Sequence, residues 1–101
     1  MVEDLSQFTH ENTQQYVGEV FTVQFANAVL ELKLEDVQVL MEKHINPRMK
    51  RDTFAWHLRG QGYAPQGTYV LQNEHFPGGL PLFIVPISQA PEGVLYEAVF
   101  N

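Results

Sequence analysis

Apolar and polar residues alternate along much of the chain, and this alternation predicts short β-strands. The clearest cases in the first half are residues 21–25 and 30–34. A period of two places successive side chains on opposite faces of a sheet, so each segment is expected to bury one face. Ala26-Asn27 lies between the segments and is short enough for a hairpin turn. We therefore predict an antiparallel pair of strands.

The apolar phase changes within the second of these strands, and this change predicts a β-bulge. Keeping the first phase would point Asp36 into the core, whereas Val37, Val39 and Met41 form the next apolar set. One extra residue at 35–36 restores the alternation, and a β-bulge supplies that residue while bending the strand. Strongly bent strands are what a small closed sheet requires.

Further strands are predicted in the second half of the chain. Glycine and proline indicate breaks or turns at residues 60–62, 77–79 and 90–93. The strands are expected at residues 53–59, around Tyr69 and Leu71, at residues 80–87 and at residues 96–101. In the last strand Tyr96 and Phe100 share a face, so the chain is expected to end inside its own sheet.

The segment 80–87 is apolar on both faces, so one of its faces needs a cover. Either Phe83 and Val85 point into the core and Leu82 and Ile84 point outward, or the reverse holds. An exposed apolar face on a sheet is normally packed against another element or a partner. The N-terminal helix and a partner chain are both open as the cover.

One short helix is predicted before the first strand. Thr9 is a suitable N-cap for residues 10–17, Gly18 is a suitable stop, and the few apolar residues suggest packing on the sheet surface. These elements predict an all-β fold with one short N-terminal helix, in which about six antiparallel strands form a meander that curls into a closed or nearly closed barrel. Residues 1–101 are expected to form a single domain.

Composition and charge narrow the class of protein. The chain is 45% hydrophobic and 12% aromatic, which is typical of a globular core. It contains no cysteine, so disulfides and thiolate metal sites are excluded. Residues 1–4 include two acidic side chains and no apolar stretch follows them, so we expect no signal peptide, no transmembrane segment and a cytoplasmic location. A net charge of −6 argues against nucleic acid as a partner.

The basic residues are concentrated in one segment. Four of the six lie within nine residues, and the rest of the chain carries two basic and twelve acidic residues, a balance of −10. The pair Asn46-Pro47 in the same stretch favours a turn. We interpret residues 43–52 as an exposed basic loop on an acidic body and as the best candidate for a partner contact, with Lys43, Arg48, Lys50 and Arg51 as its basic side chains.

No group of residues in the sequence predicts catalysis, a cofactor or a metal. The four histidines are scattered, and none is paired with a metal ligand at a recognisable spacing. His57 and Arg59 alternate with apolar residues and are expected on the solvated outer face, where they are further candidates for partner contacts. Tyr63, near the break at 60–62, is either a packed loop aromatic or a ligand-stacking residue.

Several runs resemble a small bacterial family catalogued only as a domain of unknown function. The most specific are residues 66–69 (Gln-Gly-Thr-Tyr), 82–86 (Leu-Phe-Ile-Val-Pro) and 96–101 (Tyr-Glu-Ala-Val-Phe-Asn). The resemblance extends through most of the chain. It implies a small β-barrel with no established activity, and an accessory role near phage-tail-like or surface-fibre systems.

Taken together, these patterns favour a non-enzymatic module for protein–protein interaction or assembly. The expected partner is another protein or a second copy of the chain, without nucleic acid or membrane. A barrel that binds a small molecule or a carbohydrate near Tyr63, His57 and Arg59 is the alternative.

Overall fold

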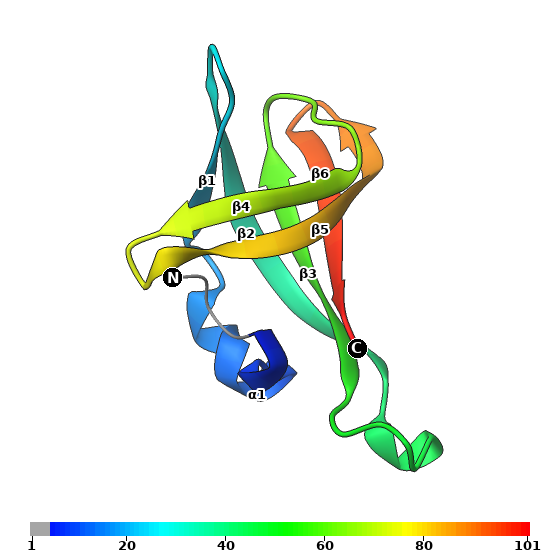
Figure 1. Cartoon of the computed structure of the whole chain (residues 1–101). Coiled ribbons are helices and arrows are strands. Elements are labelled where there is room, and N and C mark those ends of the chain that lie inside the picture. The colour runs from blue at the N-terminus through cyan, green and yellow to red at the C-terminus, as the bar shows by residue number, and fades with distance from the viewer. Residues whose placement is uncertain (1–4) are drawn as a thin grey trace.

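The computed structural model describes residues 5–101, and its strands close into a small barrel (Figure 1). Residues 1–4, on which part of the signal-peptide expectation depends, lie outside the described residues. Within 5–101 there are six strands: β1 (Val20–Gln24), β2 (Val29–Met41), β3 (Thr53–Gly60), β4 (Gly67–Asn73), β5 (Phe76–Ala90) and β6 (Gly93–Phe100). The predicted antiparallel barrel is confirmed.

The order of strands around the barrel is β1-β2-β3-β6-β5-β4. Each half of the chain is a meander, but β3 pairs with β6 instead of with the next strand in sequence. The ring closes between β1 and β4, where Thr22 pairs with Gln72. The C-terminal strand β6 therefore lies between β3 and β5, which confirms that the chain ends inside its own sheet.

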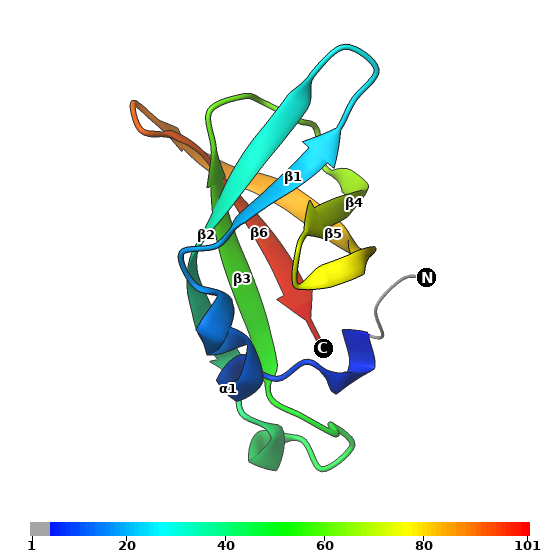
Figure 2. The same cartoon turned by 90° about the vertical axis from the view of Figure 1, so that its left-hand side faces the viewer.

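Residues 5–16 form three short helices at one end of the barrel (Figure 2). They are the 3-10 helix η1 (Leu5–Gln7), the α-helix α1 (His10–Thr13) and the 3-10 helix η2 (Gln14–Tyr16). Thr9 caps α1 as predicted: the Asn12 N–H donates to its hydroxyl at 3.0 Å, and the Asn12 side chain accepts from the Thr9 N–H at 2.9 Å. The segment then turns at Gly18, whose φ of +96° is in the range that favours glycine.

The barrel interior is filled by aromatic and branched side chains. Trp56 lies at its centre, with ring centroids 5.4 Å from Phe100, 5.5 Å from Phe21 and 6.0 Å from Phe8. The predicted inward faces of β1, β2 and β3 are confirmed by the burial of the following residues: Phe21, Val23, Leu30, Leu32, Leu34, Phe54, Trp56 and Leu58. Phe25, the last residue of the predicted first strand, lies beyond β1 and is 40% exposed. Phe8 precedes α1 and also enters the core, so the N-terminal segment contributes to the interior.

The predicted bulge in β2 is present. The pairing with β3 shifts between Leu34 and Asp36, so Glu35 is the extra residue. Beyond the bulge Val37 packs against the core, as expected. Met41 was expected to face inward and is exposed, because β2 has a second register shift near its end and continues past the barrel into the next loop.

The turn predicted at residues 77–79 is wrong, because the chain turns earlier, between β4 and β5. The Asn73 side chain accepts a hydrogen bond from the His75 N–H at 2.8 Å, and Asn73 then pairs with Phe76. An asparagine side chain that bonds two residues ahead is a common way to make a turn. The glycines remain within β5, and Gly79 (φ +80°) has no room for a Cβ, which would lie 2.6 Å from Val70 Cγ1.

In the doubly apolar segment of β5, Leu82 and Ile84 point inward and Phe83 points outward. Phe83 is 53% exposed, and the N-terminal helices pack mainly against β2. The N-terminal helix therefore does not cover the outer face of β5 at Phe83. That a partner chain covers this face stays a prediction. None of the helices between residues 5 and 101 is long and apolar enough to cross a membrane.

Phe100 joins the last strand to the core of the barrel. Its ring stacks on Phe54 at 4.7 Å with an interplanar angle of 5°, and its side chain is buried. We expect Phe100→Ala to lower the free energy of unfolding by about 3–5 kcal/mol in urea titrations. Val99→Ala, at the exposed neighbouring position, should cost under about 1 kcal/mol. Equal losses in the two variants would contradict this role.

Candidate functional site

The predicted basic loop, residues 43–52, projects from one end of the barrel between β2 and β3 (Figure 1). We call it the distal loop; it begins with the 3-10 helix η3 (Lys43–Ile45). Lys43, Arg48 and Lys50 are exposed, as expected for a contact surface. Ile45 is 66% exposed among them, so the loop offers an apolar side chain as well as charge.

Arg51 was expected to be exposed with the other basic residues, and this is wrong. Its Nη1–H donates to the carbonyls of Leu5 and Phe8, and its Nε–H donates to the carbonyl of Asn101 at 2.9 Å. The guanidinium carbon also lies 5.5 Å from the centre of the Phe54 ring. A guanidinium carries five donors in a rigid fork, which suits it to join several carbonyls. Arg51 therefore holds the N-terminal segment against the end of β6.

His57 was expected on a solvated outer face, and the structure buries it there instead. Its side chain is 11% exposed because two carboxylates from the flanking strands cover it. Nδ1 lies 2.6 Å from Asp36 on β2, and Nε2 lies 3.0 Å from Glu97 on β6. Because a carboxylate only accepts hydrogen bonds, both contacts are strongest when both ring nitrogens carry a proton.

The two carboxylates raise the pKa of His57. Burial of the ring acts to lower this pKa, but the hydrogen bonds that the ring donates to Asp36 and Glu97, with the negative charges of these carboxylates, outweigh it. Both ring nitrogens are occupied, so the ring offers no free nitrogen to a substrate. This arrangement stabilises the outer face of the barrel and does not suit catalysis.

The bulge in β2 also places a second ion pair beside His57. Because Glu35 is the extra residue, it and Asp36 both lie on the exposed face. Glu35 accepts two hydrogen bonds from Arg59, at 2.8 and 3.1 Å, and the bonds from Arg59 hold the pKa of Glu35 below its usual value. Arg59 is thus held by a partner within the chain and is less available to another molecule than the sequence suggested.

A groove of about 520 Å³ opens at the other end of the barrel, between the β1–β2 hairpin and the segment after β3. The ligand-binding alternative placed Tyr63, His57 and Arg59 near one site. Tyr63 and Arg59 both line the groove, whereas His57 lies outside it. Further lining residues are Phe25, Val29, Leu30, Glu31, Lys33 and Gln61.

The segment after β3, which forms one wall of the groove, is held in place by the buried side chain of Tyr96. The Tyr96 hydroxyl donates to the Gly62 carbonyl at 2.8 Å and accepts from the Ala64 N–H at 2.7 Å. Burial raises the pKa of Tyr96, so its hydroxyl keeps the proton that the first bond requires. Tyr63 is carried between these two anchored residues, which presents its ring to solvent.

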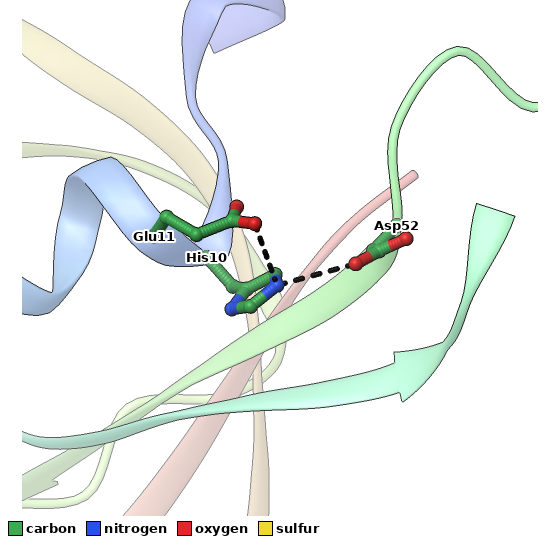
Figure 3. A group of neighbouring side chains, drawn as sticks. All are labelled: His10, Glu11 and Asp52. Atoms are coloured by element: carbon green, nitrogen blue, oxygen red, sulfur yellow. Dashed lines mark ion pairs between the residues drawn. The ribbon is translucent and has the colours of Figure 1, made fainter.

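Among the described residues, two side-chain clusters have donor atoms suited to a metal ion. One joins His10 and Glu11 of α1 to Asp52 at the end of the distal loop (Figure 3). The other joins Glu19 to Glu74 and His75. The sequence predicted neither, because each cluster brings together segments that lie more than 40 residues apart. Only the strand order and the path of the distal loop show that they meet.

His57 should make stability depend on pH. Below about pH 6.5, the ordinary pKa of histidine, it is protonated in both folded and unfolded chains and its two charged bonds stabilise fully. As the pH rises through the higher pKa of the folded protein, the proton is lost and this contribution disappears. In urea titrations at about pH 6, His57→Gln should cost about 1–3 kcal/mol, and the difference from wild type should shrink at higher pH.

His44→Gln is the control for this experiment, since the His44 side chain is 72% exposed. We expect it to leave the pH profile of unfolding nearly unchanged. A constant difference between wild type and His57→Gln across the pH range would show that the ring stabilises by packing alone.

Neither the comparison with curated proteins nor the comparison with solved structures finds a match to the chain. The family described as Domain of unknown function (DUF6916) matches residues 8–100, from the core residue Phe8 to the stacked Phe100. This range includes all six strands and the distal loop. The chain therefore belongs to the DUF6916 family.

Proposed function

We propose that this protein is a non-enzymatic interaction module that docks through its distal loop on acidic surfaces of proteins, including further copies of itself. The observation that carries the proposal is a loop with exposed cations and an exposed isoleucine that projects beyond the barrel. The proposal also includes an accessory role in the assembly of phage-tail-like or surface-fibre systems, which the family resemblance suggested. We place this role in the bacterial cytoplasm.

The charge distribution supports an acidic partner. The distal loop holds four of the six basic residues of the chain and one acidic residue, Asp52, and the remainder has a balance of −9. A strongly dipolar protein attracts surfaces of opposite charge and orients them during encounter. In a second copy of the chain, eleven of the twelve acidic residues lie outside the distal loop.

The loop also has the composition of a contact that excludes water. Ile45 and exposed Lys43 both belong to η3, while Leu40 and Met41 are exposed at the end of β2, just before the loop. Apolar side chains with a charged rim are the usual anatomy of a protein interface. Arg48 is the best candidate for the central contact, because its guanidinium can hold a carboxylate through two hydrogen bonds.

A specific observation supports ligand binding as a second candidate function. The groove beside Tyr63 combines exposed aromatic rings with charged and amide groups. Small-molecule sites are typically concave, with apolar walls and a few fixed polar groups. A carbohydrate ring, which has an apolar face and hydroxyl edges, fits this chemistry.

For the distal loop, the test compares two variants with the same change of charge. Arg48→Glu alters the loop, and Lys33→Glu alters an exposed cation on the barrel wall. We expect Arg48→Glu to weaken self-association in sedimentation velocity at about 50 mM salt, with less effect at about 500 mM, where exposed charges are screened. Lys33→Glu should have a smaller effect. Equal effects would show that net charge, not the loop, controls association.

If wild type is monomeric, the same pair of variants tests binding to other proteins. Stoichiometric partners retained by Lys33→Glu and lost by Arg48→Glu would support the proposal. Identical eluates from the two variants would contradict it. Both substitutions are on the surface and should change stability by only about 0.5 kcal/mol, which thermal melts can check.

For the groove, the test is a thermal-shift screen with mono- and disaccharides. A ligand that binds only the folded state raises the melting temperature. We expect any such shift to be lost in Tyr63→Ala and kept in Phe83→Ala, which removes an exposed aromatic outside the groove. A shift that survives Tyr63→Ala would place the ligand elsewhere.

A further inference from the structure

We propose that His10, Glu11 and Asp52 bind a Zn²⁺ ion at the junction between α1 and the distal loop (Figure 3). This inference is independent of the proposed docking function. It also departs from the expectation, drawn from the sequence alone, that the chain has no metal site.

The distances between donor atoms fit such an ion. His10 Nε2 lies 3.3 Å from Glu11 Oε2 and 3.2 Å from Asp52 Oδ2, and all three donor atoms lie within 4.8 Å of one another. Zinc is bound tetrahedrally at about 2.0–2.2 Å from nitrogen and oxygen, so neighbouring donors stand about 3.4 Å apart. The two edges of the cluster that meet at His10 already have about this length, and the third edge, between Glu11 and Asp52, is within 4.8 Å.

Contacts outside the cluster hold two of the three ligands in place. Asp52 Oδ1 accepts a hydrogen bond from the Lys43 N–H at 2.8 Å, which leaves Oδ2 directed at His10. Hydrogen-bonded partners of this kind orient metal ligands. On the other side, Thr9 caps α1 and so fixes the turn that carries His10.

The ligand types favour zinc over calcium or magnesium. Calcium and magnesium are bound by oxygen atoms, whereas imidazole suits zinc and its neighbours in the transition series. Three protein ligands leave a fourth position for water or for a donor from another molecule. His10 and Asp52 have side chains that are 25% and 22% exposed, so the site is sheltered yet open to solvent on the side of Glu11.

The second cluster is less suited to an ion and serves as an internal control. His75 and Glu19 have side chains that are 45% and 36% exposed. The Glu19 oxygen that faces His75 also accepts a hydrogen bond from the Asn73 side chain at 3.2 Å. That oxygen is therefore engaged from two sides, whereas Asp52 uses different oxygens for its two contacts.

Zinc at this junction would join the N-terminal segment to the base of the distal loop. Arg51, next to Asp52, already binds carbonyls of Leu5 and Phe8. The ion would add a second link between the same two segments, so we expect bound zinc to restrain the loop and to protect its amide protons from hydrogen exchange.

The test is calorimetric titration of tag-free, chelator-treated protein with zinc chloride. We expect one Zn²⁺ per chain for wild type, and binding about tenfold or more weaker in His10→Ala and in Asp52→Asn. His75→Ala should bind as wild type does. Magnesium chloride should give no comparable heat.

Thermal melts of the same variants without zinc establish that each one folds. If His10→Ala does not fold, Glu11→Gln replaces it, because the Glu11 side chain is 73% exposed and its loss should leave the fold intact. The proposal is overturned if wild type does not bind zinc, if the variants of this cluster bind as tightly as wild type, or if His75→Ala alone loses binding. Equal binding of magnesium would also overturn it, since the site would then select charge alone.

Discussion

The bulge at Glu35 in β2 determines both how the barrel closes and what lies on its outer face. Before the bulge, Leu32 and Leu34 point into the core, and after it Val37 does so. A strand without the extra residue would bury Asp36 and expose the apolar residues that follow, because a shift of one residue exchanges the two faces. The same residue bends β2, as a barrel of so few strands requires.

Two ion pairs on the outer face depend on this bulge. It leaves two consecutive acidic side chains outside the barrel, where Glu35 binds Arg59 and Asp36 binds His57. Glu97 then reaches His57 from the next strand, so charged contacts extend across β2, β3 and β6. Exposed pairs contribute little to stability, but the sheltered His57 is worth more because its partners exclude water.

The N-terminal segment is joined to the core by hydrogen bonds as well as by packing. The Trp56 indole N–H donates to the Thr13 hydroxyl at 3.2 Å, and that hydroxyl donates to the Thr9 carbonyl at 2.7 Å. Thr13 is fully buried, so each bond satisfies a group that would otherwise be costly to bury. In the part of the chain that the structure describes, no buried polar side-chain atom lacks a partner.

Local sequence patterns predicted the elements well and their long-range contacts poorly. Alternation identified the strands, and the break in alternation identified the bulge, because both depend only on neighbouring residues. The turn near Gly78 was misplaced, since the side chain of Asn73 starts the turn before the glycines do. The burial of His57 and the hydrogen bonds of Arg51 depend on strand order and on contacts between residues 40 or more positions apart. The alternation of apolar and polar residues carries no information about such contacts.

The groove and the distal loop lie at opposite ends of the barrel, and this separation leaves space around each of them. In Figure 1 the β1–β2 hairpin beside the groove is at the top, and the loop between β2 and β3 is at the bottom. The principal dimensions of the molecule are 45 × 33 × 23 Å, and the two features lie toward the ends of the long direction. Molecules bound at the two ends would not compete for space, so this small barrel has the geometry of a spacer that can hold two different surfaces apart.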